Sequence, residues 1–277
     1  MRVFITAALI VLSAAAAAVG QADIRKIDFK NFTYDAYCAS DTTEKVTVKD
    51  GEFFKETQEL DYVDRFYFQV FGVSYGDLNG DGADEAIALT VCNTGGTGNF
   101  SEGHVFTLKS GKPSKIAYVP GGDRAYGGLR SSQVENGLLV VESNDVGENG
   151  GACCPEFVVT NRYRLQGGRL IEVGTAERRE LYPAERVTFA KGTSGKTFKV
   201  TIPAQELKRL VVGARAGQTL TVSIDTDKAS LRLLQDASVT EGANNFLARL
   251  PKNGDYTIEI QNFQEIDAEI TVNIKIR

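Results

Sequence analysis

Residues 77–85 have the side-chain types and spacing of a cation-binding loop. Oxygen-bearing side chains stand at every second position from residue 77 to residue 81, and Gly82 follows where such a loop turns sharply. Ca²⁺ takes about six to eight oxygen ligands in a flexible cage, so this spacing predicts a calcium site. The predicted ligands are Asp77, Asn79, Asp81 and Glu85 through their side chains, and Ala83 through its carbonyl group.

An alternative for this loop is an Asx-rich glycine turn, because Asp, Asn and Gly favour tight turns without any metal. We favour calcium because the Asp-x-Asn-x-Asp-Gly order is more specific than turn chemistry requires. The flanking runs at 67–71 and 86–91 are typical of strands, so the loop is not a helix-paired EF-hand. No water-activating base stands beside the loop in sequence, which indicates a structural role for the metal.

The cysteines indicate an oxidising compartment, because they are even in number and have no metal-binding spacing. They are Cys38, Cys92, Cys153 and Cys154. Four cysteines allow three pairings, among which we favour Cys38–Cys92. The adjacent Cys153 and Cys154 either bridge each other or reach different partners.

Catalysis by a nucleophile, a histidine and a carboxylate would have to use His104, the only histidine. No Gly-x-Ser-x-Gly elbow accompanies it. His104 begins an apolar run, which favours a hydrogen-bonded histidine at a strand end over a catalytic base. Hydrolysis by two carboxylates depends on a separation that the fold sets, and the sequence indicates no particular pair. We therefore expect a protein that is not an enzyme.

The chain reads as a signal peptide and two β domains. Residues 1–22 have a positive start, an apolar Ala-rich stretch and a small-residue cleavage pattern, and no later stretch is long and apolar enough to span a bilayer. Residues 23–174 alternate short apolar runs with Gly, Asn and Asp turns, which predicts an antiparallel β domain. The charged residues 175–186 predict a linker with one helical turn, and strands at roughly ten-residue spacing over 187–277 predict a β-sandwich.

The formal net charge of −5 is divided unevenly. Residues 23–174 carry 15 Lys and Arg against 23 Asp and Glu, a balance of −8, whereas residues 175–277 carry 15 against 13, a balance of +2. No run of basic residues is interleaved with aromatic residues. The sequence therefore gives no sign of a nucleic-acid partner.

Two parts of the sequence resemble known families. The segment 77–85 between two strands resembles the calcium loop of FG-GAP-type repeats, and the surrounding region resembles secreted bacterial proteins. The first resemblance implies that Asp77, Asn79, Asp81 and Glu85 occupy ligand positions. Residues 210–224 and 250–260, with Arg215-Ala216-Gly217-Gln218 and Pro251-x-x-Gly254-x-Tyr256, resemble the pre-peptidase C-terminal domain and the periplasmic inhibitors of goose-type lysozyme. That second resemblance implies a β-sandwich of jelly-roll type.

The predicted function is that of an exported, non-catalytic binding protein, periplasmic or secreted, whose partner is a protein or a cell-envelope ligand. Calcium would stabilise the first domain, and the β-sandwich would serve as an interaction module. The alternative is a periplasmic inhibitor of goose-type lysozyme or of another cell-wall lytic enzyme. That alternative predicts an exposed, protruding partner loop made of Asn253, Gly254, Asp255 and Tyr256.

Overall fold

The computed structural model describes residues 23–38, 43–147 and 150–277. The predicted signal peptide, residues 1–22, lies outside the described residues. The chain divides into two compact units. Unit 1 comprises Met1–Pro155 and Val159–Glu177, and unit 2 comprises Glu156–Val158 and Arg178–Arg277.

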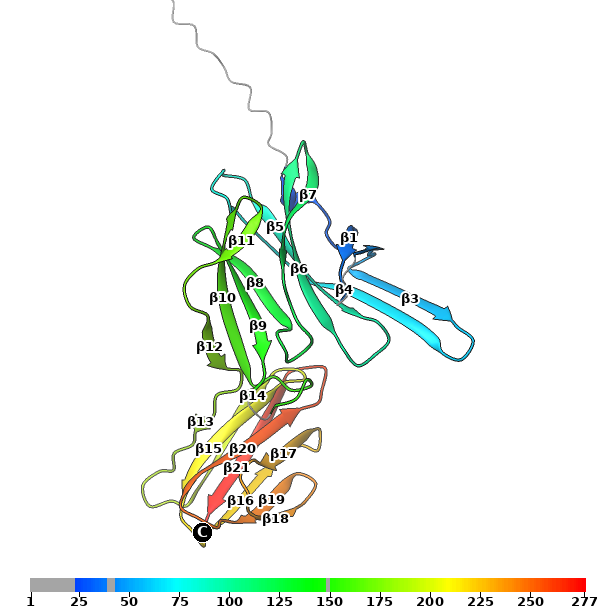
Figure 1. The fold of residues 1–277 in the computed structure, drawn as a ribbon. Coiled ribbons are helices and arrows are strands. Elements are labelled where there is room, and N and C mark those ends of the chain that lie inside the picture. The colour runs from blue at the N-terminus through cyan, green and yellow to red at the C-terminus, as the bar shows by residue number, and fades with distance from the viewer. Residues whose placement is uncertain (1–22, 39–42, 148–149) are drawn as a thin grey trace, which may run out of the picture. The chain divides into compact units, whose positions relative to one another are not determined.

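The fold is mainly β, as predicted (Figure 1). The described residues contain one short helical segment, the 3-10 helix η1 (Ile24–Lys26), in which Asp23 accepts a hydrogen bond from the backbone N–H of Arg25. Within the described ranges, no helix has both the length and the apolar character that a membrane crossing needs.

The main sheet of unit 1 has five antiparallel strands in the order β3-β4-β5-β6-β7. Consecutive strands are neighbours, so the sheet is a simple meander. Its strands are β3 (Glu52–Gln58), β4 (Val63–Gly76), β5 (Glu85–Asn93), β6 (Phe100–Lys109) and β7 (Lys112–Val119).

Both faces of this sheet are covered near β5, and each face has its own apolar core. Ala86 and Ala88 of β5 face one core, which includes residues of η1 and of the pair β1 (Thr33–Ala36) and β2 (Glu44–Thr47). Ile87 and Leu89, which alternate with them, face the second core. The continuous apolar run of β5 follows from burial on both faces.

A second sheet of unit 1 supplies the other side of the second core. Its path runs β11-β10-β9-β8, and β12 also pairs with β10. The strands are β8 (Leu129–Glu135), β9 (Leu138–Asp145), β10 (Phe157–Gln166), β11 (Arg169–Glu172) and β12 (Glu177–Glu180). Phe157 and Val158 of β10 and residues 178–180 of β12 belong to unit 2, and the rest of this sheet belongs to unit 1.

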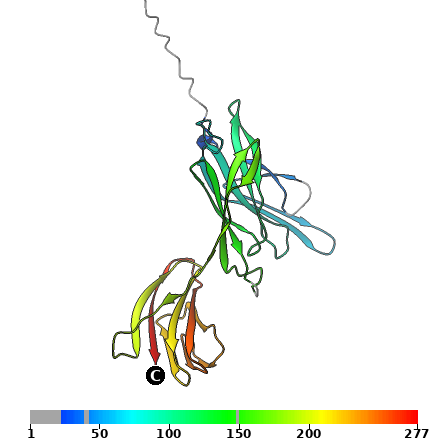
Figure 2. The ribbon, with the colours of Figure 1, turned by 60° about the vertical axis from the view of Figure 1, so that its left-hand side comes forward.

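Unit 2 consists of two sheets that share one apolar core, which makes it a β-sandwich (Figure 1, Figure 2). One sheet has the order β13-β15-β20-β17 and the other the order β14-β21-β16-β19-β18. The strands are β13 (Glu185–Arg186), β14 (Gly195–Ile202), β15 (Leu207–Ala214), β16 (Thr219–Ile224), β17 (Ala229–Leu233), β18 (Ser238–Glu241), β19 (Asn245–Arg249), β20 (Gly254–Asn262) and β21 (Ala268–Ile276).

The helical turn predicted within residues 175–186 is wrong, because that segment contains strands β12 and β13. β13 pairs in parallel with β15, with Glu185 opposite Leu210. Pairing with an available sheet edge satisfies backbone groups that a single helical turn would leave without partners.

Candidate functional site

The acidic loop connects β4, which ends at Gly76, to β5, which begins at Glu85. Gly80 and Gly82 have φ angles of 80° and 82°, and an added Cβ at either would meet nothing within 4 Å. The left-handed backbone, rather than a lack of space, therefore explains the two glycines. They let the chain curl so that its side chains fold back on its own backbone.

The polar side chains of the loop accept hydrogen bonds from its backbone. Asp77 accepts from the N–H groups of Asn79 at 3.2 Å, Gly80 at 2.7 Å and Gly82 at 2.9 Å. The carboxamide oxygen of Asn79 accepts from Asp81 N at 2.8 Å. The hydrogen bonds that Asp77 accepts, led by the one from Gly82, hold the pKa of Asp77 below its ordinary value. Asp77 is therefore ionised at neutral pH.

Glu85 lies beneath the loop and is fully buried. Its carboxylate accepts from the backbone N–H of Leu78 and from the side-chain amide of Asn79, both at 2.9 Å. Burial raises the pKa of Glu85, and the negative charges of Asp81 and Asp77 raise it further. Three carboxylates therefore lie in one small region, and the buried Glu85 is the one whose ionised form this region disfavours.

The donor chemistry fits the predicted calcium ligands, although the predicted coordination shell is not formed in this conformation. Within the described residues, no group of three or more His, Cys, Asp or Glu side chains is arranged to hold a metal ion. The loop instead satisfies its oxygens through internal hydrogen bonds. Asp77 Oδ1 already accepts two hydrogen bonds, whereas Asp77 Oδ2 and Asn79 Oδ1 accept one each. These two oxygens therefore keep a second lone pair for a hard cation. The calcium ligand set remains a prediction.

Beside the loop lies a cavity of about 520 Å³. Asp81 and Asp84 line it together with residues of η1 and of the β6–β7 region. Arg25 donates a hydrogen bond to Asp84 at 2.6 Å, which ties η1 to the loop. The loop is therefore held from below by Glu85 and from the side by Arg25.

His104 lies inside unit 1 and not at a strand end exposed to solvent. It is fully buried on β6, its Nε2 is 3.3 Å from the Thr90 hydroxyl and 3.7 Å from Glu102 Oε1, and within the described residues its Nδ1 has no hydrogen-bond partner. The expected hydrogen bond is present at Nε2, but the expected strand-end position is wrong, because His104 lies in the middle of β6. Glu102 is 3 % exposed and accepts from the backbone N–H of Tyr37. The ring of Tyr118 also approaches His104, with centroids 6.3 Å apart.

The cysteines form two disulfides, Cys38–Cys92 and Cys153–Cys154. The first confirms the favoured pairing. It links the segment after β1 to β5, across a sequence separation of 54 residues. The second is the vicinal alternative for the adjacent pair.

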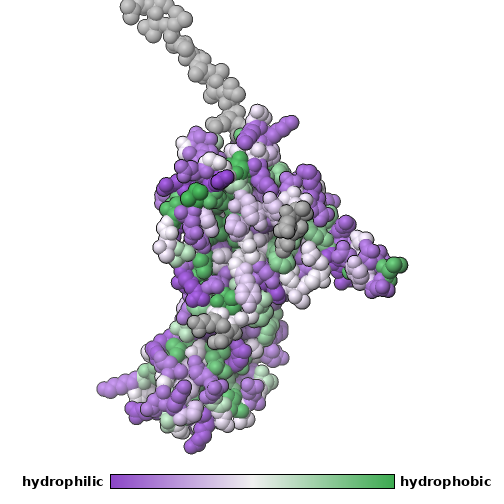
Figure 3. Space-filling model, in the orientation of Figure 1, coloured by the Kyte–Doolittle hydropathy of each residue, from purple (hydrophilic) through white to green (hydrophobic). Residues whose placement is uncertain are grey.

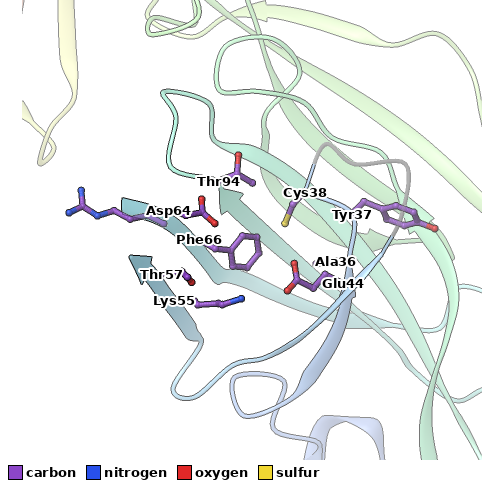
Figure 4. Close-up of a pocket in the computed structure, with 10 residues that line it drawn as sticks. Ala36, Tyr37, Cys38, Glu44, Lys55, Thr57, Asp64, Phe66 and Thr94 are labelled. Atoms are coloured by element: carbon purple, nitrogen blue, oxygen red, sulfur yellow. The ribbon is translucent and has the colours of Figure 1, made fainter. Parts of the chain in front are cut away.

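A cavity of about 280 Å³ lies beside Cys38 (Figure 4). Glu44 and Asp64 contribute carboxylates to its lining, whereas Lys55 and Arg65 contribute cations. The lining of this cavity therefore carries both positive and negative side chains, unlike the acidic loop.

The predicted partner loop in unit 2 is wrong for Tyr256. This side chain is 1 % exposed, and its hydroxyl donates to the Lys252 carbonyl at 2.7 Å. Tyr256 faces the core because β20 begins at Gly254 and Tyr256 pairs with Val212 of β15. Asp255 is exposed, as predicted, but it lies in the strand and forms an ion pair with Arg186.

The remaining residues of that segment support a turn. Asn253 accepts a hydrogen bond from the backbone N–H of Ala216 at 2.9 Å, and Gly254 has a φ angle of 152°. The segment 253–256 is therefore a turn leading into a strand, and its largest side chain is unavailable to a partner. Sequence reasoning missed this because an alternation of Gly, Asp and Tyr is compatible with either face of a strand.

Comparisons with known proteins place the chain in no family. No protein-family model matches the sequence, and no curated protein matches it. Among solved structures, it is similar to the periplasmic inhibitor of g-type lysozyme PliG from Aeromonas hydrophila, with 20 % identity, coverage of 34 % of this chain and 96 % of that one, and a TM-score of 0.30. The Salmonella Typhimurium PliG gives 22 % identity, coverage of 33 % and 96 %, and a TM-score of 0.29.

A third similarity is to an exo-beta-1,3-galactanase from Phanerochaete chrysosporium, with 9 % identity, coverage of 85 % of this chain and 71 % of that one, and a TM-score of 0.22. Similarities with TM-scores this low do not identify a function.

Proposed function

We propose that this protein is an exported, non-catalytic binding protein whose first unit is stabilised by calcium and whose β-sandwich serves as an interaction module. The observation that carries the calcium assignment is the buried Glu85 carboxylate beneath a loop that also holds Asp77 and Asp81. Two disulfides support export, since such bonds persist in oxidising compartments.

Calcium would relieve the repulsion among these three carboxylates. The ligands we propose are the predicted ones, with Asn79 and the Ala83 carbonyl completing the set. A bound Ca²⁺ supplies positive charge and accepts oxygen donors in a flexible geometry. Its role here would be to hold the β4–β5 connection, and through Arg25 and Asp84 the position of η1.

The burial of His104, the only histidine, and of its neighbour Glu102 supports a non-catalytic function. A catalytic base must reach a proton of the substrate, directly or through one water. His104 is fully buried, and Glu102 is nearly so. The rings of Tyr34, Phe106 and Tyr118 pack around His104, although Tyr118 is 37 % exposed and lines a cavity of about 240 Å³ together with Glu102.

The alternative function is inhibition of a goose-type lysozyme or of another cell-wall lytic enzyme. Two observations favour it: unit 2 is a β-sandwich, as the resemblance implied, and the segment 23–174 is acidic enough to attract a basic enzyme. The buried Tyr256 removes the loop first expected to make the contact. An inhibitor would need a different contact surface.

Thermal unfolding tests the calcium assignment. A ligand that binds only the folded state adds about 2.7 kcal/mol to the free energy of unfolding when its concentration is about 100 times its dissociation constant. We expect Ca²⁺ to raise the melting temperature of the wild type relative to chelator, and Asp81→Ala to abolish that shift. Asp227→Ala, which removes an exposed carboxylate from unit 2, should keep it. No shift in the wild type at millimolar Ca²⁺ would reduce the loop to a turn.

A further inference from the structure

The β3–β4 hairpin of unit 1 forms an arm that extends beyond the rest of that unit (Figure 1, Figure 2). β3 is the edge strand of its sheet and pairs with β4, from Glu52 opposite Gln69 to Gln58 opposite Val63. A two-stranded ribbon without further cover is marginally stable in water. We call residues 52–65 the hairpin arm.

The end of the hairpin arm exposes large apolar side chains. Leu60 is 100 % exposed, Tyr62 is 64 % exposed and Val63 is 37 % exposed. Figure 3 shows hydrophobic residues at the far end of this projection. A single exposed apolar side chain is ordinary, but several at the end of one projecting hairpin form a surface that a partner can bury.

Negative charge surrounds these apolar side chains. Glu59, Asp61 and Asp64 alternate with or adjoin them, and no ion pair among the described residues involves any of the three. The nearest cation along the arm, Arg65, is paired with Glu56 at 3.1 Å. The tip is therefore both apolar and acidic, and two such tips would repel each other.

We propose that the hairpin arm is the docking element for a basic protein partner, whose apolar depression takes up Leu60 and Tyr62 while its cationic rim faces Glu59, Asp61 and Asp64. This inference rests on the proposed binding function and names the surface and the partner chemistry. Apolar burial would supply the affinity, and charge complementarity would speed association and select basic over acidic partners. A projecting hairpin reaches into a concave surface that a flat sheet face cannot enter.

Binding of the full exported chain to a goose-type lysozyme, chosen as the basic probe, tests the proposal by surface plasmon resonance. We expect the double variant Leu60→Ser/Tyr62→Ser to bind at least about tenfold more weakly, because it removes the apolar surface that the partner would bury. Glu59→Gln/Asp61→Asn should mainly slow association and weaken its salt dependence. The matched control is Tyr126→Ser/Ile171→Ser, which removes two exposed apolar side chains from unit 1 outside the hairpin arm and should leave binding unchanged.

The outcomes separate the inference from the proposed function. Binding by the wild type that both arm variants retain would overturn the arm as docking element but keep the binding function. Absence of wild-type binding to the basic probe would overturn the partner chemistry. The change in melting temperature with Ca²⁺ is a separate measurement and does not depend on that result. Sedimentation of the wild type as a dimer, lost in the Leu60→Ser/Tyr62→Ser variant, would make a second copy of the chain the occupant instead. Circular dichroism of each variant verifies folding.

Discussion

At the scale of single residues, the raised pKa of Glu85 links calcium to pH. A carboxyl group whose pKa is higher in the folded than in the unfolded state binds protons more readily when the protein is folded. The calcium-free protein therefore loses stability as pH rises through that raised pKa. Calcium requires the ionised group and should offset this loss. We expect the melting-temperature gain from Ca²⁺ to shrink on acidification toward the raised pKa of Glu85.

The variant Glu85→Gln separates the two contributions. In chelator, it should flatten the fall in melting temperature with rising pH, because no ionisable group remains in that buried position. In Ca²⁺ it should lose most of the gain. Asp77 acts in a lower pH range, since its pKa is lowered and its contribution is lost only when pH falls through that lowered value. An unchanged pH profile in Glu85→Gln would contradict this assignment.

The residue types of the loop could be predicted, but the environment of each could not. The spacing of Asp77, Asn79 and Asp81 is visible in the sequence, whereas the burial of Glu85 depends on β5 being covered on both faces. Tyr256 illustrates the same limit, because a tyrosine after Gly254-Asp255 turns inward once the strand begins at Gly254. Which face a side chain takes is set by strand register, and one position reverses it.

At the scale of elements, β20 contains a buried carboxylate whose removal should destabilise unit 2. Glu259 accepts hydrogen bonds from Arg209 at 3.0 Å and from Arg232 at 2.5 Å, and its side chain is 7 % exposed. Because Arg232 is largely exposed, solvent screens part of the interaction, and we expect Glu259→Gln to lower the free energy of unfolding by about 2 kcal/mol. Urea unfolding measures this change.

Glu269→Gln is the matched control for that measurement. Glu269 pairs with Lys199 at 2.6 Å, but both side chains are more than 60 % exposed. Removal of an exposed pair changes stability by about 1 kcal/mol or less. Equal effects of the two substitutions would show that burial does not set the strength of the Glu259 interaction.

Strand periodicity predicts which segments of this chain are extended but not how they are covered. The runs at 67–71 and 86–91 fall within β4 and β5, as expected. The hairpin arm and the covering pair of β1 and β2 were not anticipated, because alternation alone does not show what covers a strand. Cover depends on contacts between segments far apart in sequence.

At the scale of the whole molecule, the disulfides and the candidate metal-binding residues are concentrated in unit 1. Both disulfides and the acidic loop belong to it, whereas unit 2 has no cysteine and rests on one apolar core. The difference in charge between residues 23–174 and 175–277 follows the same division. An uneven distribution of charge and cysteine was visible in the sequence, since it needs only a count along the chain.

This asymmetry predicts two calorimetric unfolding transitions that respond to different reagents. Each unit has its own core, so each should unfold cooperatively. Calcium should raise one transition only, and reduction of Cys38–Cys92 should lower that same transition, because a disulfide contributes about 2–4 kcal/mol by restricting the unfolded chain. Glu259→Gln should lower the other. A single transition shifted by all three changes would show that the two units unfold as one, and the calcium loop would then stabilise the β-sandwich as well.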